Sequence, residues 1–347
     1  MIAAGGTAGH VLSALAVAEA LTARGVFVTL AGSPDRVEAR LVPEAGYELD
    51  TFRVEGLPRQ PSPALARALF RAGAAPVAVR RILRHRRPDV VFGAGGFVAG
   101  PAVVAAASMR IPAALAEADA HLGLANRLAL PFAQRAFLAY PLAGRYGAKF
   151  RVVGRPIPAR AHAIPQAEAR EIFELPSDVP VLLVAGALAG ARSLNELVVE
   201  SFGEVGPSIL HVSGERDYAS LRGRVRRPDY RLVPTTERIG AAYSAADLVL
   251  SRAGSAVWEL AAAGKPAVLV PYPFATGDHQ ARNADYFVRA GGAVMVRELD
   301  LEDVPDMVRS LLDDPDRLAR MREAMLRVAR PHAAEEVAEG LIELARG

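Results

Sequence analysis

Short apolar segments alternate with helical segments along almost the whole chain. Most of the apolar segments are continuous runs, which is typical of parallel strands buried on both faces. The predicted strands are 1–4, 26–31, 48–54, 90–93, 113–116, 135–138, 150–153, 181–185, 208–212, 231–233, 248–250 and 267–270. Since a helical pattern follows nearly every strand, the sequence predicts an α/β protein with doubly wound, Rossmann-like sheets.

The alternation breaks at Gly154-Arg155-Pro156-Ile157-Pro158 and begins again with strand 181–185. A chain of 347 residues is long enough for two domains. We expect an N-terminal domain over 1–154 and a C-terminal domain over 155–330. Pro331 separates the last two predicted helices, so the helix in 331–347 is expected to rejoin the first domain. Two such domains in tandem predict a ligand site in an interdomain cleft.

Composition narrows the class of protein. No apolar run approaches the roughly 18 to 20 residues of a membrane-spanning helix, and no signal-peptide pattern is present. The chain has no cysteine, which excludes disulfides and thiolate nucleophiles and favours a cytoplasmic location. It has no HExxH or paired-carboxylate motif, so no metal or cofactor is expected. The formal net charge of +3 gives no reason to expect a nucleic-acid partner.

Positive charge is concentrated in one predicted helix that ends before Pro88. The cationic residues are Arg80, Arg81, Arg84, His85, Arg86 and Arg87, preceded by Arg67, Phe70 and Arg71. The segment is either a basic amphipathic surface for anionic lipid headgroups or a solvent-facing side of the helix.

Glycine-rich loops follow several strands. The first is Gly5-Gly6-Thr7-Ala8-Gly9-His10, which leads into a helix and suits an anion. Its spacing is neither GxGxxG nor a P-loop, and Gly32-Ser33-Pro34 rather than an acidic residue closes the second strand, so dinucleotide binding is disfavoured. Further loops are 93–101, 186–192 and 252–256; the Arg252, Gly254 and Ser255 combination suits a diphosphate. The loop 93–101 also fits a turn that only permits close packing.

Polar side chains in the second half suit a sugar nucleotide. Glu259 stands in an otherwise apolar, small-residue helix, where ribose hydroxyls would give its carboxylate partners. A proline-stiffened loop then delivers Asp278, His279 and Gln280 together, with Asn283 one helical turn further. This density of hydrogen-bonding groups fits a sugar, although an exposed Glu259 and a helix cap at Asp278 are the alternatives.

These blocks together resemble the MurG family of bacterial glycosyltransferases. The family has GGTGGH where this chain has Gly5 to His10, GGYVSGP at Gly95 to Pro101, and VVGNP at Val152 to Pro156. The similarity continues in the second half through Gly190-Ala191-Arg192 with Asn195, the segment 243–254, Glu259 to Gly264, and Asp278-His279-Gln280 with Asn283. The resemblance therefore runs over essentially the whole chain.

The resemblance implies a GT-B architecture and an inverting transfer of N-acetylglucosamine from UDP-N-acetylglucosamine to undecaprenyl-diphosphate-linked muramyl-pentapeptide, a step of peptidoglycan synthesis. It implies a peripheral enzyme on the cytoplasmic face of the cell membrane. The implied donor contacts are Thr7, Ala8, Gly9, Arg155, Leu188, Thr236, Ile239, Arg252, Gly254, Ser255, Ala256, Glu259, His279, Gln280 and Asn283. The implied acceptor contacts are Gly95, Gly96, Phe97, Asp119 and Asn126. His10 is our choice of general base, because the unperturbed imidazole pKa is about 6.5; Glu117 is the competing base.

Some positions depart from the family pattern. Ala116-Glu117-Ala118-Asp119 replaces HEQN, and Leu188-Ala189 replaces the serine and glutamine of GGSQGAR. These changes keep two other interpretations open: a UDP-sugar transferase with a different lipid or natural-product acceptor, and a non-catalytic UDP-sugar-binding protein. An epimerase of UDP-N-acetylglucosamine is a further possibility at the level of the fold.

Overall fold

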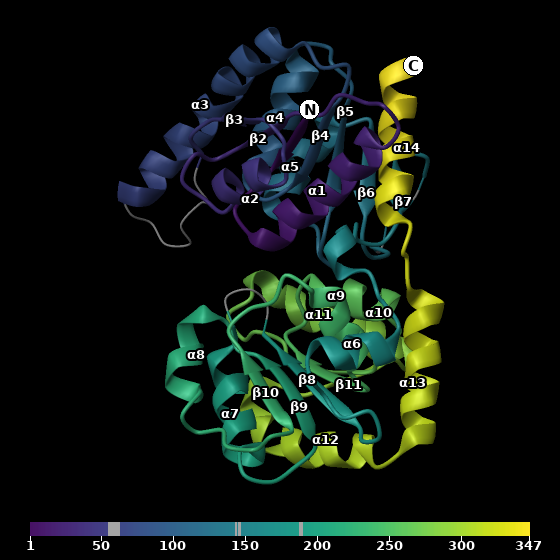
Figure 1. Ribbon diagram of the computed structural model, residues 1–347. Coiled ribbons are helices and arrows are strands. Elements are labelled where there is room, and N and C mark those ends of the chain that lie inside the picture. Colours follow the sequence, from purple (N-terminus) through teal and green to yellow (C-terminus); the bar gives the residue numbers. More distant parts are fainter. Residues whose placement is uncertain (55–62, 143, 145–146, 187–189) are drawn as a thin grey trace. The chain divides into compact units, whose positions relative to one another are not determined.

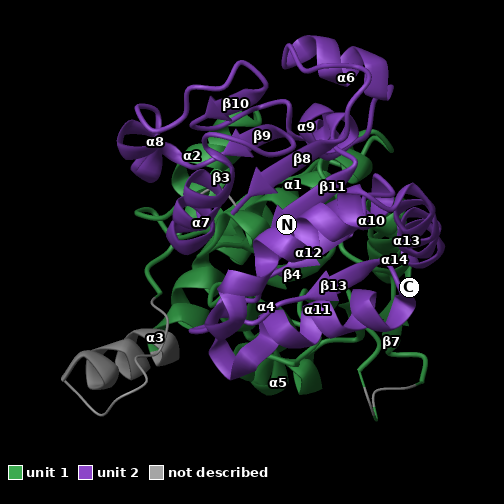
Figure 2. Cartoon of the chain, turned by 90° about the horizontal axis from the view of Figure 1, so that it is seen from below, with its two compact units in different colours: residues 1–158, 331–347 green, residues 159–330 purple. Residues whose placement is uncertain are grey.

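The computed structural model describes residues 1–54, 63–142, 144, 147–186 and 190–347, and in the helix that begins at Pro63 it describes side chains from residue 74 onward. The chain divides into two compact units, one formed by 1–158 with 331–347 and the other by 159–330 (Figure 2). The boundary predicted from the sequence, after Gly154, lies a few residues earlier. The difference has a physical reason, because the buried Arg155 side chain hydrogen-bonds to Ser13 in unit 1.

Unit 1 contains a wholly parallel seven-stranded sheet in the order β3-β2-β1-β4-β5-β6-β7 (Figure 1). Its strands are β1 (Ile2–Ala4), β2 (Leu30–Gly32), β3 (Leu49–Thr51), β4 (Val91–Gly95), β5 (Ala113–Glu117), β6 (Arg135–Leu138) and β7 (Phe150–Val152). Its helices are α1 (Ala8–Thr22), α2 (Glu38–Glu44), α3 (Pro63–Arg86), α4 (Ala99–Ser108), α5 (Leu124–Ala129), the 3-10 turn η1 (Leu130–Phe132) and α14 (Ala333–Arg346). Two separate apolar clusters show that helices cover the sheet on both faces.

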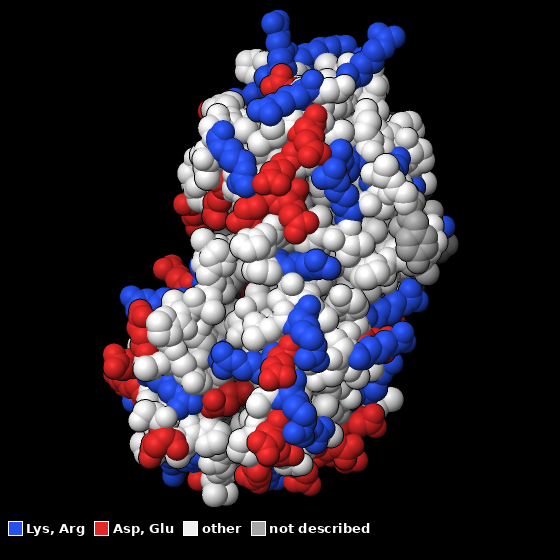
Figure 3. All heavy atoms as spheres, turned by 90° about the vertical axis from the view of Figure 1, so that its right-hand side faces the viewer, with Lys and Arg blue, Asp and Glu red and all other residues white. Residues whose placement is uncertain are grey.

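The C-terminal helix α14 belongs to unit 1. Val337 and Leu341 are buried in the same cluster as residues of α1. Arg135 donates to the Gly340 carbonyl at 2.9 Å and to Glu343 at 2.7 Å. Acidic side chains follow the outer side of α14 beside basic ones (Figure 3), and Arg24 pairs with Glu339 at 3.4 Å. Apolar burial and ion pairs together fix α14 to unit 1.

Unit 2 repeats the same plan with a parallel six-stranded sheet in the order β10-β9-β8-β11-β12-β13. The strands are β8 (Val181–Ala185), β9 (Ser208–Val212), β10 (Tyr230–Val233), β11 (Leu248–Ser251), β12 (Ala267–Leu269) and β13 (Ala293–Met295). The helices are α6 (Gln166–Ile172), α7 (Arg192–Phe202), α8 (Glu215–Leu221), α9 (Ile239–Ala245), α10 (Ala256–Ala262), α11 (His279–Ala290), α12 (Val304–Leu312) and α13 (Pro315–Val328), with 3-10 turns η2 (Ala159–Ala161), η3 (Thr276–Asp278) and η4 (Glu298–Asp303). No helix of the described residues is long and apolar enough to cross a membrane.

Three strand predictions were wrong in detail. The strand predicted over 48–54 forms β3 only over Leu49–Thr51. The strand predicted over 26–31 pairs only over Leu30–Gly32, with β1 at Leu30 and Ala31 and with β3 at all three residues. β13 was not predicted; it is three residues long, follows Gly291-Gly292 and pairs only with β12 at the edge of the sheet. Such a short edge strand leaves almost no period-two signal in the sequence.

Candidate functional site

In unit 1 the loops after β1 and β4 touch each other at the carboxyl edge of the sheet. A Cβ atom at Gly96 would lie 2.0 Å from the Gly5 carbonyl oxygen, and one at Gly6 would lie 2.7 Å from Cε1 of Phe97. Gly6 and Gly96 also have positive φ angles of 87° and 73°. These glycines are therefore required by the packing of the two loops, whichever ligand the loops bind. β1 and β4 are also where the winding of the sheet reverses, the usual ligand position in such folds.

His10 lies where these two loops meet. A Cβ atom at Gly95 would lie 2.5 Å from Cδ2 of His10, so the imidazole packs directly on the β4 loop. The Thr7 hydroxyl is 3.0 Å from Nδ1 of His10 and is also the side-chain cap of α1, accepting from the His10 amide. Ala8 and Gly9 form the start of α1. The structure thus brings His10 together with the predicted acceptor residues Gly95 and Gly96.

Glu38, which the sequence did not single out, is a fully buried carboxylate behind the first loop. Its Oε2 accepts from the Gly6 amide at 3.1 Å, and its Oε1 accepts from the Ser33 amide at 3.0 Å. No acidic residue directly follows the second strand; the carboxylate belongs instead to the first residue of α2. Its carboxylate points inward to the backbone, so Glu38 is not placed as a ribose ligand of a dinucleotide.

Glu117, the competing base, is anchored in a turn at the end of β5. Oε2 accepts from the Gly123 amide and from Nδ2 of Asn126, each at 2.9 Å, and Oε1 accepts from the Asp119 amide at 3.2 Å. Burial raises the pKa of the Glu117 carboxyl, and these hydrogen bonds act in the opposite direction. Asn126 also donates to the Ala116 carbonyl at 2.9 Å. The predicted residues Glu117, Asp119 and Asn126 are therefore one hydrogen-bonded turn.

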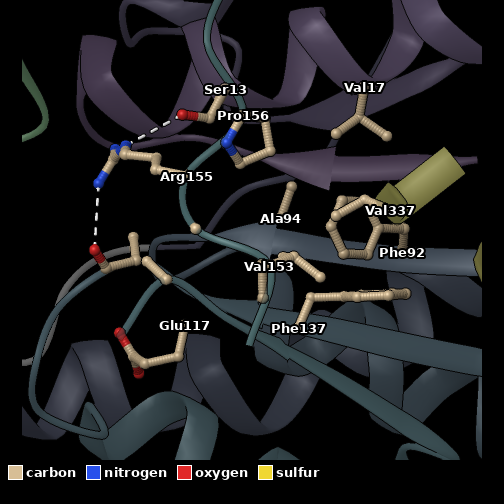
Figure 4. Close-up of a pocket in the computed structure, with 14 residues that line it drawn as sticks. Ser13, Val17, Phe92, Ala94, Glu117, Phe137, Val153, Arg155, Pro156 and Val337 are labelled. Carbon is tan, nitrogen blue, oxygen red and sulfur yellow. Dashed lines mark hydrogen bonds between the residues drawn. The ribbon is translucent and has the colours of Figure 1, made fainter. Parts of the chain in front are cut away.

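Arg155 lies inside unit 1 rather than among residues of unit 2. Its Nε donates to the Ser13 hydroxyl at 3.0 Å and its guanidinium also reaches the Ala118 carbonyl at 3.4 Å (Figure 4). Arg155 and Glu117 border a mostly apolar pocket of about 20 Å³, which has room for a water molecule but not for a sugar nucleotide. Arg155 holds α1 and the β5 turn together, and its predicted contact with the donor remains a prediction.

In unit 2 the loop after β11 carries the predicted diphosphate residues Arg252, Gly254 and Ser255, and Ala256 begins α10. The Arg252 side chain is buried and already has protein partners. It forms an ion pair with Glu298, donates to the Ser193 hydroxyl at 2.8 Å and reaches the Val270 carbonyl at 3.2 Å. Its guanidinium therefore supports the loop, and its predicted charge contact with a diphosphate remains a prediction.

Glu259 is partly buried and has a protein partner that the sequence analysis did not foresee. The hydroxyl of the buried Tyr243 donates to its Oε2 at 2.7 Å. Burial and the Glu259 charge raise the pKa of Tyr243 well above its usual value, so the phenol keeps its proton and acts as the donor. Thr236 accepts from the Arg238 amide at 3.0 Å, and Ile239 is the first residue of α9. A tyrosine thus orients the carboxylate predicted to bind ribose.

The start of α11 lies against the loop after β11. Nε2 of Gln280 is 3.7 Å from the position of a Cβ at Gly254, and Nδ2 of Asn283 donates to the Ala253 carbonyl at 3.3 Å. His279 contacts the Thr276 carbonyl through Nδ1 at 2.9 Å. The structure therefore brings together Gly254, Gln280 and Asn283 as predicted neighbours, whereas Leu188 lies outside the described residues.

A buried polar chain supports the start of α7. His211 is fully buried, with Nδ1 2.8 Å from the Tyr230 hydroxyl and Nε2 3.0 Å from Oδ1 of Asn195. Nδ2 of Asn195 donates to the Ser213 carbonyl at 2.8 Å and to Asp217 at 2.9 Å. Since the Asn195 amide nitrogen is the donor in both bonds, its oxygen accepts from Nε2–H of His211, and Nδ1 accepts from Tyr230. Desolvation lowers the pKa of His211 to about 3.

Comparison with known proteins assigns both units to one family. Residues 1–138 match the glycosyltransferase family 28 N-terminal domain, and residues 181–337 match the glycosyltransferase family 28 C-terminal domain. A UDP-N-acetylglucosamine–N-acetylmuramyl-(pentapeptide) pyrophosphoryl-undecaprenol N-acetylglucosamine transferase from Acidithiobacillus ferrooxidans is 42% identical over 100% of this chain and 98% of its own length. The chain belongs to the MurG family. A relative of the same name from Mycolicibacterium paratuberculosis is 42% identical over 100% of this chain and 88% of its own length.

A solved MurG structure from Acinetobacter baumannii has the same fold, with a TM-score of 0.78, 28% identity and 99% of both chains covered. The predicted resemblance to MurG and the predicted pair of Rossmann-like units of a GT-B glycosyltransferase are thus confirmed. The loops after β1 and β4 lie within the matched N-terminal domain, and the loop after β11 lies within the matched C-terminal domain.

Proposed function

We propose that the protein transfers N-acetylglucosamine from UDP-N-acetylglucosamine to undecaprenyl-diphosphate-linked muramyl-pentapeptide and releases UDP. The observation that carries this proposal is the 42% identity, over the entire chain, to relatives that bear the name of this reaction. The reaction is a step of peptidoglycan synthesis and therefore of cell-wall biogenesis.

His10 is the proposed general base in unit 1. It takes the proton of the acceptor hydroxyl as that oxygen attacks the anomeric carbon, and the bond between that carbon and the UDP oxygen breaks with inversion. The 3.0 Å contact between the Thr7 hydroxyl and Nδ1 supports this role, because it orients the imidazole where the two loops meet. Gly95, Gly96 and Phe97 pack around His10 and Gly6, which makes them suitable acceptor contacts.

Unit 2 is the proposed donor-binding unit. Glu259, oriented by Tyr243, binds the ribose hydroxyls, and Thr236 and Ile239 border the uracil. His279, Gln280 and Asn283 read the sugar from α11, and Gly254, Ser255 and Ala256 surround the diphosphate.

We propose a peripheral location on the cytoplasmic face of the membrane. Arg81, Arg84 and Arg87 are exposed along and just after α3, whereas Arg86 is paired with Asp50 and Glu48. Exposed apolar side chains accompany them on α3, α5 and η1: Val77 is 66% exposed, Leu124 58%, Leu128 65% and Phe132 47%. α3 and α5 both pack on α4, so they share one face of the sheet. Basic and apolar groups on one face fit an anionic lipid surface.

Two measurements test the location and the proposed independence from metals. An Arg81→Glu, Arg84→Glu double variant should sediment less with anionic vesicles than the wild type, whereas neutral vesicles should retain neither protein.

We further expect transfer in the presence of EDTA to match transfer with Mg²⁺, because the sequence holds no metal-binding motif. A requirement for added metal contradicts that expectation.

The transfer itself is tested with radiolabelled UDP-N-acetylglucosamine and a panel of acceptors. The proposal expects label in the muramyl-pentapeptide lipid and a loss of about 10²- to 10⁴-fold in rate for His10→Ala. Label only in another lipid favours a transferase with a different acceptor. The replacement of the family's HEQN by Ala116 to Asp119 motivates this alternative. UDP binding without UDP release from any acceptor favours a non-catalytic protein, and a changed sugar without an acceptor favours an epimerase.

A further inference from the structure

Glu38 ties together the loops that follow β1 and β2. Its carboxylate is fully buried at the carboxyl edge of the unit 1 sheet. One oxygen accepts from the Gly6 amide in the first loop and the other from the Ser33 amide in the second, at 3.1 Å and 3.0 Å. A single side chain thus fixes two backbone positions that are far apart in the sequence.

Two glycines make room for this carboxylate. A Cβ atom at Gly5 would lie 2.2 Å from Oε1 of Glu38, and one at Gly32 would lie 2.7 Å from its Cγ. Gly5 does not have a positive φ angle, so the conformation of its backbone does not require glycine. The space that Glu38 occupies is what excludes a side chain there. The buried carboxylate thus depends on glycine at both positions, Gly5 and Gly32, for the space it occupies.

The carboxylate has no cation beside it among the ion pairs of the described residues, and its partners are the two backbone amides. A buried carboxylate without a cation is unfavourable for folding unless hydrogen bonds compensate it. Because the Gly6 amide is already bound to Glu38, it is not available to a phosphate. The first glycine loop therefore does not hold an anion through Gly6, contrary to the simplest interpretation of its sequence.

The loop that Glu38 fixes is the one that carries His10. Beyond Gly6, the Thr7 hydroxyl contacts Nδ1 of His10, and the imidazole packs on Gly95. Any displacement of the Gly6 amide moves Thr7 and with it the ring. The reach of an imidazole to a reacting hydroxyl tolerates only a small error, because proton transfer requires hydrogen-bond distance.

We propose that Glu38 is a positioning residue for the transfer reaction, which holds the Gly5–Gly6 turn, and through it His10, in the geometry that proton transfer needs. This inference rests on the proposed role of His10. Glu38 does not contact substrate; it acts through the backbone. It should therefore influence the turnover rate and leave binding of the donor in unit 2 unchanged.

The first test compares Glu38→Gln with Glu44→Gln, a matched control on the same helix whose exposed carboxylate pairs with Arg40. The glutamine places an NH₂ group against one of the two backbone N–H groups, leaving a buried donor without an acceptor. At a temperature well below unfolding, and per folded molecule, we expect kcat to fall about tenfold or more while the KM for UDP-N-acetylglucosamine changes less than about twofold. Glu44→Gln should match the wild type. A wild-type kcat in Glu38→Gln overturns the proposal.

A double-variant cycle keeps the proposal testable even if Glu38→Gln fails to fold. Gly5→Ala places a methyl group against Oε1 and should lower kcat. Glu38→Asp withdraws the carboxylate by one methylene, so Gly5→Ala should cost at least about threefold less in the Glu38→Asp background than in the wild type. Effects that simply multiply show that Gly5 and Glu38 are not coupled and contradict the inference.

His10→Ala separates this inference from the proposed function. If His10→Ala is impaired and the Glu38 variants are not, the inference fails and the function stands. If His10→Ala retains the wild-type rate, the proposed base fails. In that case faster amide exchange at Gly6 and Ser33 in Glu38→Gln still supports the tie between the loops, and unchanged exchange rejects it.

Discussion

The buried His211 makes a quantitative prediction about unit 2. Desolvation lowers its pKa to about 3, whereas an unfolded histidine titrates near 6.5. The folded state therefore binds fewer protons than the unfolded state over this interval. Its contribution to stability is complete above about pH 6.5 and is lost progressively as the pH falls toward 3. Acid should destabilise unit 2 through this one residue.

The magnitude follows from the distance between the two pKa values. At pH 5 the pH is about 1.5 units below the pKa of the unfolded imidazole, whereas the folded imidazole is still neutral. Each pH unit of this difference corresponds to about 1.36 kcal/mol of unfolding free energy. The free energy of unfolding should therefore fall by about 2 kcal/mol between pH 7.5 and pH 5 because of His211 alone. His211→Gln provides the control, because a glutamine can accept from Tyr230 and donate to Asn195 without titrating.

Urea unfolding followed by tryptophan fluorescence suits this prediction. Trp258 is the single tryptophan of the chain and is buried in unit 2, so its signal reports the unit that contains His211. The wild type should lose about 2 kcal/mol more than His211→Gln between pH 7.5 and pH 5. If the unfolding free energies of the wild type and His211→Gln change with pH in parallel, within about 0.5 kcal/mol, the assignment of a buried neutral imidazole is refuted.

Two further substitutions separate binding from catalysis. Glu117→Gln removes one acceptor from the turn that holds Asn126. We expect kcat to fall about tenfold, which corresponds to the loss of one buried hydrogen bond. A loss above about 10²-fold would identify Glu117 as the general base. Tyr243→Phe deletes the bond to Glu259, so initial-rate kinetics should show the KM for UDP-N-acetylglucosamine rising about tenfold at nearly constant kcat. An unchanged KM would show that Tyr243 does not orient a donor ligand.

The sequence predicted the parts of the fold that depend on local pattern. Continuous apolar runs such as 181–185 became central strands with the predicted limits, because both faces of such strands are buried. Edge elements were harder, since β13 owes its existence to pairing with β12 rather than to its own three residues. The same reasoning applies to β2, whose residues have partners in β1 and β3 only from Leu30 onward.

The candidate site was predicted as separate motifs, and the structure supplied the contacts between them. The family resemblance implied acceptor contacts at Gly95 and Gly96, whereas their packing against His10 and Gly5 is a long-range contact that spacing cannot reveal. Tyr243 and Glu38 were missed for the same reason, because each becomes a partner of a site residue only in three dimensions. The sequence therefore pointed to candidate site residues, whereas the side chains that orient them became apparent only in the structure.

The central claim is tested most directly by one transfer assay with purified protein, labelled UDP-N-acetylglucosamine and the muramyl-pentapeptide lipid, run beside the His10→Ala variant. We expect label to enter the muramyl lipid in proportion to UDP released by the wild type, and the variant to be slower by about 10²-fold or more. A folded wild-type protein that binds UDP but transfers no label to this lipid would contradict the account.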